Sequence, residues 1–517
     1  MSKAVNIITK NIFYMYGNTI LTVFISLYST RIILDSLGVS DFGIFTIVGG
    51  AIGLLGFFNG SISSATQRFI NYAQGENNYT KIREIFNSSV LTHIILSIII
   101  FIILEFAFFI YFNGVLNIPA DRIYSAKCIY HIMVISCILG ICASPYNACI
   151  NAHEDMGVLS LWGIVMCIMK FITAVCISLS PIDKLIFYGL CMALIQFSNL
   201  CVIYIYCKKK YPECILHLHL YSRKNTIKEI CQYASYRLLS TLTSMISVYG
   251  GNIIINNFFG TIVNAAQGIA NQISGQLMTF SVSLKSAVNP VIGKKAGRKD
   301  FTSMIKYALT TSKLSFFLLS CLSVVFFIEM PLILNFWLKE VPEWAIIFCQ
   351  LELIKNLLYQ MLEGPKSAIY SVGKIRSFSI CETLIYIIPL PIIYISFLKG
   401  APPTSFYYII ILFFNIVAGV VIVYYSHKNC NMSIRNFLFD IVFRCCFTLI
   451  IVFIISSIPH LLLPASYIRL GIVFIVSIIS LFITFYYIGL NKSEKEIIIN
   501  LLLRFKSFIS QKLAKHE

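Results

Sequence analysis

The feature that most constrains this chain is a series of about fourteen apolar runs, each long enough to cross a lipid bilayer as a helix. A helix needs about 20 residues to span the hydrocarbon core, and polar residues end each run close to that length. The runs cover residues 11–34, 43–70, 88–112, 125–150, 159–179, 185–206, 230–259, 263–292, 307–334, 344–370, 378–398, 405–425, 437–458 and 468–490. No stretch between them is long enough to fold alone. The sequence therefore predicts an all-α integral membrane protein.

The charged residues support this class and indicate how the chain is oriented. They make up only 12 % of the chain, whereas soluble domains average about 25 %. A net charge of +18 is typical of a nucleic-acid binder only where basic residues gather on a soluble face. Here most Lys and Arg lie in short loops on one side of the membrane. By the positive-inside rule, this predicts a multi-pass protein with cytoplasmic N- and C-termini and no nucleic-acid partner.

The 17 cysteines lie mostly inside apolar runs. Free Cys behaves there as a small hydrophobic residue. We therefore predict neither disulfide bonds nor a metal site.

Two pairs of segments suggest an internal repeat. IILDSLG, ending at Gly38, resembles IIINNFFG, ending at Gly260, and SISSATQRFINYAQG (61–75) resembles SVSLKSAVNPVIGKKAG (281–297). An even number of spans separates the copies, so an axis along the membrane normal should relate them. This predicts two pseudo-symmetric six-helix lobes, followed by two further helices. The predicted parts are 1–206, a basic linker 207–229, 230–427, 428–490, and a basic amphipathic tail 491–517 on the inner leaflet.

The segment GVSDFGIFTIVGGAIGLLGFFNGSISSATQRFINYAQGENN (38–78) resembles the second helix and basic loop of the polysaccharide transporter, or O-antigen flippase, family. That family belongs to the multidrug, oligosaccharidyl-lipid and polysaccharide exporter (MOP) superfamily. The resemblance implies a V-shaped fold with a central cavity, alternating access, and a cationic cavity lined by the first two helices of each lobe.

The resemblance also implies a substrate and a place of action. The family flips polyprenyl-pyrophosphate-linked oligosaccharides to the outer leaflet of the bacterial inner (cytoplasmic) membrane, for O-antigen, capsule or exopolysaccharide biosynthesis. The implied partners are this lipid-linked oligosaccharide, membrane lipids, and a polysaccharide polymerase with its chain-length machinery. No cofactor is implied, and coupling to protons or sodium is left open.

Basic residues within the spans are the candidate pyrophosphate contacts. A charge at mid-membrane costs about 2.5–3.5 kcal/mol and is tolerated mainly where it faces a cavity or a partner. One alternative is that Arg31 pairs with Asp35, four residues later, or extends its charged end to the outer membrane surface. Another is that Arg68 and Arg237 are membrane anchors. The four candidates are Lys285, Arg31, Arg68 and Arg237.

Amide side chains on the seventh and eighth spans are candidate sugar contacts. Asn264, Gln267 and Asn271 recur at spacings of three and four, which places them on one helical face. Asn252 and Asn256 belong to the preceding span. Sugar hydroxyl groups need such donors and acceptors. The alternative is hydrogen bonding between helices.

Carboxylates within the spans are candidates for coupling transport to an ion, because burial favours the protonated form of a carboxyl. Glu352 also precedes Lys355 by three residues, which predicts a local ion pair. The candidates are Glu105, Glu329, Glu352, Glu363 and Glu382.

Two related functions remain open, export of amphipathic cationic drugs and flipping of lipid II by a protein of the same superfamily. Drug exporters favour acidic and aromatic cavities, whereas the candidates here are mostly basic and amide residues. An enzyme such as a membrane-bound polymerase is not favoured, since the predicted outer loops are short.

Overall fold

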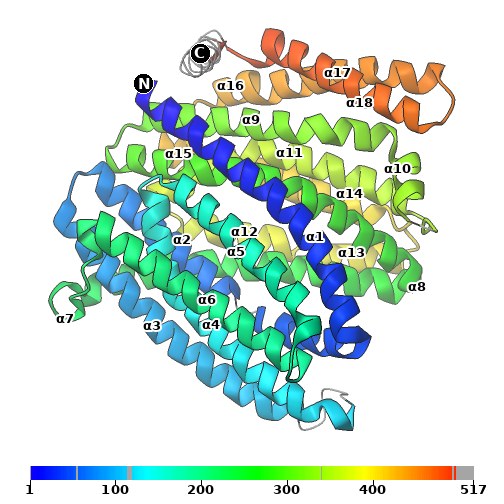
Figure 1. Ribbon diagram of the computed structural model, residues 1–517. Helices are drawn as coiled ribbons and strands as arrows, with labels where there is room; N and C mark the ends of the chain where they lie inside the picture. The colour runs from blue at the N-terminus through cyan, green and yellow to red at the C-terminus, as the bar shows by residue number, and fades with distance from the viewer. Residues whose placement is uncertain (1, 54–55, 113–118, 339, 492–493, 496–517) are drawn as a thin grey trace, which may run out of the picture. The chain divides into compact units, whose positions relative to one another are not determined.

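The computed structural model describes residues 2–53, 56–112, 119–338, 340–491 and 494–495, and their regular structure is entirely helical (Figure 1). The helices are α1 (Ser2–Gly53), α2 (Gly56–Gly75), α3 (Tyr79–Ile110), α4 (Ile123–Ala152), α5 (Met156–Cys176), α6 (Lys184–Lys210), α7 (Leu218–Tyr221), α8 (Lys224–Gly297), α9 (Phe301–Ile328), α10 (Met330–Trp337), α11 (Ala345–Val372), α12 (Arg376–Ile387), α13 (Pro389–Leu398), α14 (Ser405–Ile411), α15 (Ala418–Cys430), α16 (Ile434–Phe437), α17 (Arg444–Leu462) and α18 (Tyr467–Thr484). Short 3-10 or π segments are η2 (Ala120–Arg122), η3 (Ile177–Leu179), η4 (Pro212–Cys214), η5 (Leu412–Val417), η6 (Leu438–Phe443) and η7 (Phe485–Gly489).

The predicted all-α membrane class is confirmed. Within the described residues, 12 helical stretches are long and apolar enough to cross a membrane. One of them, α8, is 74 residues long and contains two of the predicted spans. The predicted span 43–70 is shared by α1 and α2. The predicted tail helix lies almost wholly outside the described residues.

The two longest helices break at the glycines that the sequence repeat aligns. Gly38 interrupts α1 with φ 79° and ψ 166°, and Gly260 interrupts α8 with φ 75° and ψ −172°. Glycine adopts positive φ without the steric penalty that a Cβ brings. Both copies of the repeat therefore contain the same local break.

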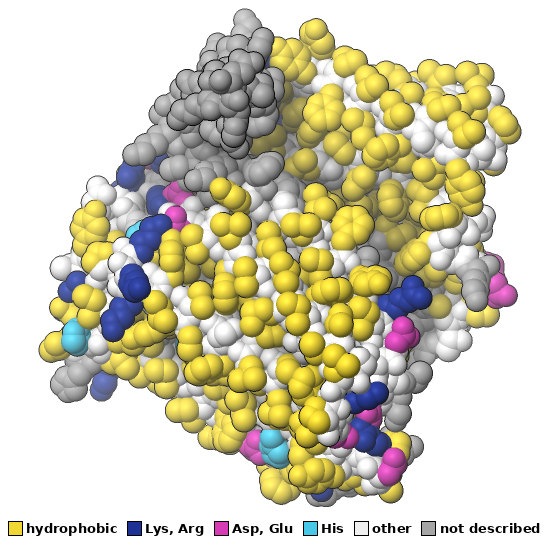
Figure 2. Space-filling view, viewed as in Figure 1, with side chains coloured by type: hydrophobic (Ala, Val, Ile, Leu, Met, Phe, Trp, Pro, Cys, Tyr) yellow, Lys and Arg dark blue, Asp and Glu magenta, His cyan; other side chains and the backbone are white. Residues whose placement is uncertain are grey.

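The chain divides into two compact units. We call Thr9–Leu242 with Asn289–Asp300 the N-terminal unit, and Met1–Ile8, Thr243–Val288 and Phe301–Glu517 the C-terminal unit. The boundaries of the predicted lobes stay a prediction. Hydrophobic side chains cover most of the visible face in Figure 2, and many large ones are exposed, including Phe24, Phe106 and Leu461. Such a surface is suited to lipid.

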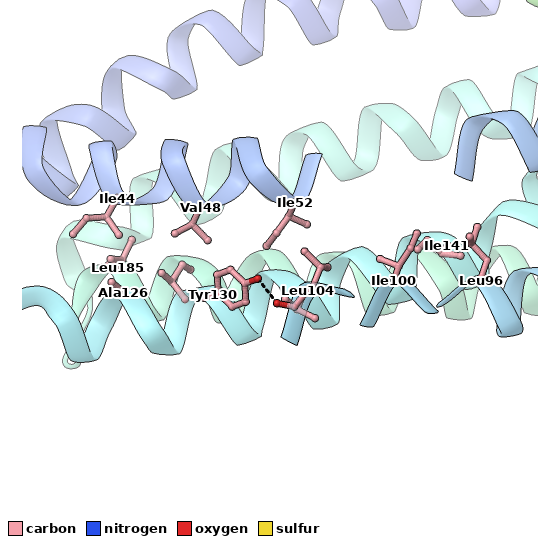
Figure 3. Close-up of a cluster of buried hydrophobic side chains, with 12 residues drawn as sticks. Ile44, Val48, Ile52, Leu96, Ile100, Leu104, Ala126, Tyr130, Ile141 and Leu185 are labelled. Atoms are coloured by element: carbon pink, nitrogen blue, oxygen red, sulfur yellow. Dashed lines mark hydrogen bonds between the residues drawn. The ribbon is translucent and has the colours of Figure 1, made fainter. Parts of the chain in front are cut away.

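The core of the N-terminal unit lies where the end of α1 packs on α3, α4 and α6. Ile44, Val48 and Ile52 are spaced four apart and meet apolar side chains of the other helices (Figure 3). Tyr130 is fully buried there and donates its hydroxyl hydrogen to the carbonyl oxygen of Leu104, 2.6 Å away. The bond satisfies a polar group that would otherwise be costly to bury.

Two glycines of the sequence repeat meet where α2 crosses the end of α8 in the N-terminal unit. A Cβ on Gly75 would lie 2.2 Å from the carbonyl oxygen of Lys294, and one on Gly297 would lie 2.1 Å from that of Tyr72. Real Cβ contacts are essentially never so short. Only glycine at both positions therefore permits this crossing.

In the C-terminal unit, α11 packs closely on α9. A Cβ on Gly364 would lie 1.9 Å from the carbonyl oxygen of Ala308, and the Gly364 amide donates to the hydroxyl of Ser312 at 2.9 Å. A second core joins α9 to α17 and α18, with the Phe317 and Phe485 rings stacked 4.3 Å apart.

Candidate functional site

The predicted pyrophosphate contact Lys285 lies beside a carboxylate in the C-terminal unit. It comes from α8, and its Nζ forms an ion pair with Glu363 of α11. The Glu363 side chain is 8 % exposed, whereas that of Lys285 is 34 % exposed. A candidate cation and a candidate coupling carboxylate thus belong to one pair. Their roles stay predictions.

This pair is one end of a longer polar network along α11. Lys366 donates to the hydroxyl oxygen of Tyr359 at 3.0 Å and forms a 2.6 Å ion pair with Glu382 of α12. The hydroxyl of Tyr370 donates to the same carboxylate at 2.6 Å. Tyr359, Lys366 and Glu382 also line a small cavity with apolar residues of α12, η5 and α15.

Arg68 and Arg237 approach the same tyrosine in the N-terminal unit. The Cζ of Arg68 lies 4.6, 5.1 and 5.4 Å from the ring centroids of Phe69, Tyr72 and Tyr233, respectively. Both arginines are close enough to Tyr233 to act on it electrostatically. A guanidinium is stabilised over an aromatic face. Tyr233 is thus a shared neighbour of two of the four predicted cations.

Arg31 is exposed on α1, as is Asp35. Neither takes part in an ion pair among the described residues. The described structure therefore contains no local Arg31–Asp35 pair, and the role of Arg31 stays a prediction.

The predicted sugar-facing amides differ in their surroundings. The Nε2 of Gln267 donates to the Oδ1 of Asn271 at 3.5 Å, and Asn256 is exposed. The side-chain oxygens of Asn252, Asn264 and Gln267 are buried and accept no hydrogen bond from the described residues. Buried acceptors without partners are unfavourable. The described structure thus supplies no hydrogen-bond donor for these three oxygens.

Every in-span carboxylate singled out from the sequence has a basic partner. Glu352 pairs with Lys355 at 2.6 Å, which confirms that local prediction. The others pair across helices: Glu105 with His131, Glu329 with His460 and Arg469, Glu363 with Lys285, and Glu382 with Lys366.

Sequence reasoning missed Lys366 and Tyr233. Lys366 follows Glu363 by three residues on α11, a spacing at which helical side chains meet. That spacing was a usable signal. Tyr233 follows the basic linker, and nothing local in the sequence links it to Arg68 at a separation of about 165 residues.

A second charged cluster of the N-terminal unit lies outside the candidate site. It joins η2 to α1 and to the residue that precedes α6. Arg122 donates to Asp41 from Nε at 2.7 Å and to Asp183 from Nη1 at 2.7 Å. Burial acts to raise the pKa of the Asp183 carboxyl. The Arg122 guanidinium and the Ile186 amide outweigh that effect and hold its pKa below the ordinary value.

Part of the chain matches a known protein family in sequence. Residues 234–341 match the family model described as MatE. No curated protein matches the chain in sequence.

The fold matches solved structures over most of the chain. A multidrug resistance MATE family transporter of the MOP superfamily, in an outward-facing conformation, is 14 % identical with a TM-score of 0.69; the match covers 83 % of this chain and 98 % of that one. A MATE structure in the straight conformation is 14 % identical, with a TM-score of 0.68 and coverages of 82 % and 96 %. A MOP superfamily transporter from Pyrococcus furiosus, described by the reversed polarity of its binding pocket, is 12 % identical, with a TM-score of 0.69 and coverages of 83 % and 99 %. The chain therefore has the all-helical fold of the MATE transporters of the MOP superfamily.

Proposed function

We propose that the chain is a transporter of an anionic lipid-linked sugar, and that it flips polyprenyl-pyrophosphate oligosaccharides across a bacterial inner membrane. The fold supports transport as the general activity. The nature of the substrate follows from the charges within the spans. Such a substrate has an anionic, hydrated head and an apolar tail, so the protein needs to shelter only the head.

The observation that carries the proposal is the pairing of the in-span carboxylates. A transporter of cationic drugs needs a carboxylate that can receive the drug's positive charge. Here Glu105, Glu329, Glu352, Glu363 and Glu382 each have a basic side chain as partner. Binding a cation at Glu329, Glu352, Glu363 or Glu382 would require breaking a pair with a lysine or an arginine, which argues against a cationic drug. Lys285 is engaged by Glu363 in the same way, so the preference for an anionic head group rests on Arg68 and Arg237.

The basic and amide residues complement such a head group. Arginine forms two parallel hydrogen bonds with a phosphate, so Arg68 and Arg237 near Tyr233 suit a pyrophosphate. The exposed side chain of Asn256 offers a donor and an acceptor to sugar hydroxyl groups. Pocket polarity also distinguishes the Pyrococcus furiosus transporter of this fold. Fold similarity therefore does not decide between drug and lipid substrates.

The test is complementation of a strain that lacks the gene. The wild type, Arg68→Ala, Arg68→Lys and Lys285→Ala would be compared for the leaflet that holds the polyprenyl-pyrophosphate oligosaccharide and for surface glycan. We expect inner-leaflet accumulation in the null strain and with both alanine variants, and partial rescue by Arg68→Lys, which keeps the charge.

Lys170→Ala is the control, because Lys170 is an exposed lysine on α5, away from the residues named above. It should restore transport fully. Membrane levels of each variant would be measured to separate loss of transport from loss of insertion. An unchanged lipid distribution in the null strain would overturn the proposal. Drug sensitivity of that strain would then support cation export.

A further inference from the structure

The end of α4 and the start of the linker bring together a group of metal-ligating side chains. Cys149 Sγ, His153 Nε2 and a carboxylate oxygen of Glu213 all lie within 4.8 Å of one another. A fourth donor adjoins them, since Cys214 Sγ is 3.5 Å from Cys149 Sγ. All four residues belong to the N-terminal unit. We propose that Cys149, His153, Glu213 and Cys214 bind one Zn²⁺ ion.

Local structure explains why these side chains meet. Cys149 and His153 are four residues apart at the C-terminal end of α4, so they point to one face of that helix. Glu213 and Cys214 are adjacent in the short helix η4. The sequence pattern is thus a Cys-x3-His pair and, about 60 residues later, a Glu-Cys pair.

The spacing of the donor atoms suits tetrahedral zinc. With Zn–S bonds of about 2.3 Å and Zn–N or Zn–O bonds of about 2.0 Å, neighbouring ligand atoms lie roughly 3.3–3.8 Å apart. The Cys149–Cys214 separation of 3.5 Å falls within that range. His153 Nε2 and Glu213 Oε1 are in direct contact at 2.5 Å, so they would move apart slightly to admit the ion.

The chemistry of the donor set selects the metal. Two thiols, one imidazole and one carboxylate form a mixed soft and borderline set, which favours Zn²⁺ over Mg²⁺ or Ca²⁺. Cys149, Cys214 and Glu213 are buried, with 0, 1 and 6 % of their surfaces exposed. Burial excludes competing water ligands. A two-thiol site is also typical of structural zinc, which closes its coordination shell with protein atoms.

Neighbouring residues hold the donors in place. The Tyr211 ring stacks on the His153 imidazole with centroids 4.1 Å apart and planes 14° apart. Arg83 donates to the carbonyl oxygen of Pro212, and Asn87 donates to that of Ile215, both at 3.2 Å. These bonds anchor η4 to α3 on both sides of Glu213. Contacts around a metal site fix the orientation of its ligands. Here the stacked Tyr211 ring orients His153, and the two backbone hydrogen bonds fix the segment that carries Glu213 and Cys214.

The alternative is a metal-free cluster, in which His153 and Glu213 form an ion pair beside buried thiols. A third state is a Cys149–Cys214 disulfide. These states differ in metal content and in thiol reactivity. One purified preparation can therefore distinguish them.

The experiment uses the full chain in detergent, purified through a tag without histidine and under reducing conditions. Zinc is measured by elemental mass spectrometry, and Co²⁺ is added to chelator-treated protein to record thiolate-to-cobalt charge-transfer absorption. We expect about one zinc per chain and a tetrahedral Co²⁺ spectrum. Cys149→Ser should weaken the charge-transfer band strongly, and Glu213→Gln should bind the metal more weakly than the wild type, because a neutral amide replaces a carboxylate ligand.

Cys167→Ser is the matched control, since Cys167 is a buried cysteine of the same unit on α5. It should bind zinc like the wild type. Far less than one zinc per chain in the wild type, with no Co²⁺ spectrum, would overturn the proposal. Equal zinc in wild type and Cys149→Ser would also overturn it, because the metal would then bind elsewhere. A Cys149–Cys214 disulfide that persists under reducing conditions would overturn it in favour of a redox pair.

Discussion

At the scale of single residues, Glu363 is a buried carboxylate of the C-terminal unit that interacts with two lysines. It pairs with Lys285 of α8 and also interacts electrostatically with Lys366 on its own helix. Removing one member of a buried pair leaves an uncompensated charge, whereas replacing both by apolar residues is often neutral. The two kinds of variant should therefore differ sharply.

Glu363→Gln should lower the free energy of unfolding by about 1–3 kcal/mol, a figure reduced from the fully buried case because Lys285 is partly exposed. The double variant Lys285→Met/Glu363→Leu should be close to wild type. Thermal unfolding of the purified protein in detergent would measure both, with exposed Glu340→Gln as control. A double variant that loses at least as much stability as Glu363→Gln would contradict this prediction, because the two residues would then not be coupled.

The Asp183 carboxyl gives a prediction with a definite pH dependence. Because its pKa in the folded protein is lowered, its interaction with Arg122 stabilises the fold above the ordinary carboxyl pKa. That stabilisation is lost as the pH falls through the lowered value.

Asp183→Asn should therefore be less stable than wild type at neutral pH, by about 1 kcal/mol. The difference should shrink as the pH falls below the ordinary value of 3.8. Asparagine preserves the helix cap that Asp183 provides to the Leu185 and Ile186 amides. Unfolding of both proteins would be followed from pH 7 to pH 3, and a constant difference across that range would contradict the prediction.

The residue scale also marks a limit of sequence reasoning. The Glu352–Lys355 pair was predictable because three residues on one helix bring two side chains together. Lys285 and Glu363 are 78 residues apart, and Cys149 and Glu213 are 64 apart. Their contacts depend on how whole helices pack, which no local spacing reveals. Apolar surroundings favour interpreting the cysteines as hydrophobic residues, and the Cys-x3-His spacing is the only local sequence signal for the zinc site proposed above.

At the scale of helices, glycine decides where the chain bends and how closely it packs. Gly38 and Gly260 break their helices by positive φ, while Gly75 and Gly297 permit α2 and the end of α8 to touch. The sequence repeat aligned each glycine with its counterpart. It did not indicate that Gly75 and Gly297 would meet each other.

Gly75→Ala and Gly297→Ala should each destabilise the N-terminal unit by about 1–3 kcal/mol, because the added Cβ overlaps backbone that cannot move independently. Gly268→Ala on α8 is the control, since no atom lies within 4 Å of its added Cβ. It should be neutral or slightly stabilising, as alanine favours a helix over glycine. Melting temperatures in detergent would test this. Similar losses at all three positions would indicate a general effect of helix propensity.

At the scale of the whole molecule, the run of apolar segments was the most informative property of the sequence. It predicted the helical membrane class, and each predicted span falls on helices of the structure. The predicted boundaries differ from the structure where one helix ends and another begins inside a single predicted run. The predicted run 307–334, for example, is divided between α9 and α10 around Glu329, a carboxylate held by Arg469 and His460.

The side of the membrane on which each loop lies is a prediction from the basic residues. A reporter fused after Lys210 should read as cytoplasmic, because Lys208, Lys209 and Lys210 precede it. A reporter fused after Gly400 should read as external. Paired alkaline phosphatase and fluorescent protein fusions would measure both, and the opposite pattern would reverse the predicted orientation.

The helix α8 passes between the two compact units twice, between Leu242 and Thr243 and again between Val288 and Asn289, next to Pro290. Proline removes one backbone hydrogen bond and is a frequent site of helix kinking. The second crossing therefore coincides with a weakened point of the helix. If the units rotate during a transport cycle, this crossing would bend more easily than the regular helical turns around it. Pro290 would then influence the rate of the cycle without contacting the cargo.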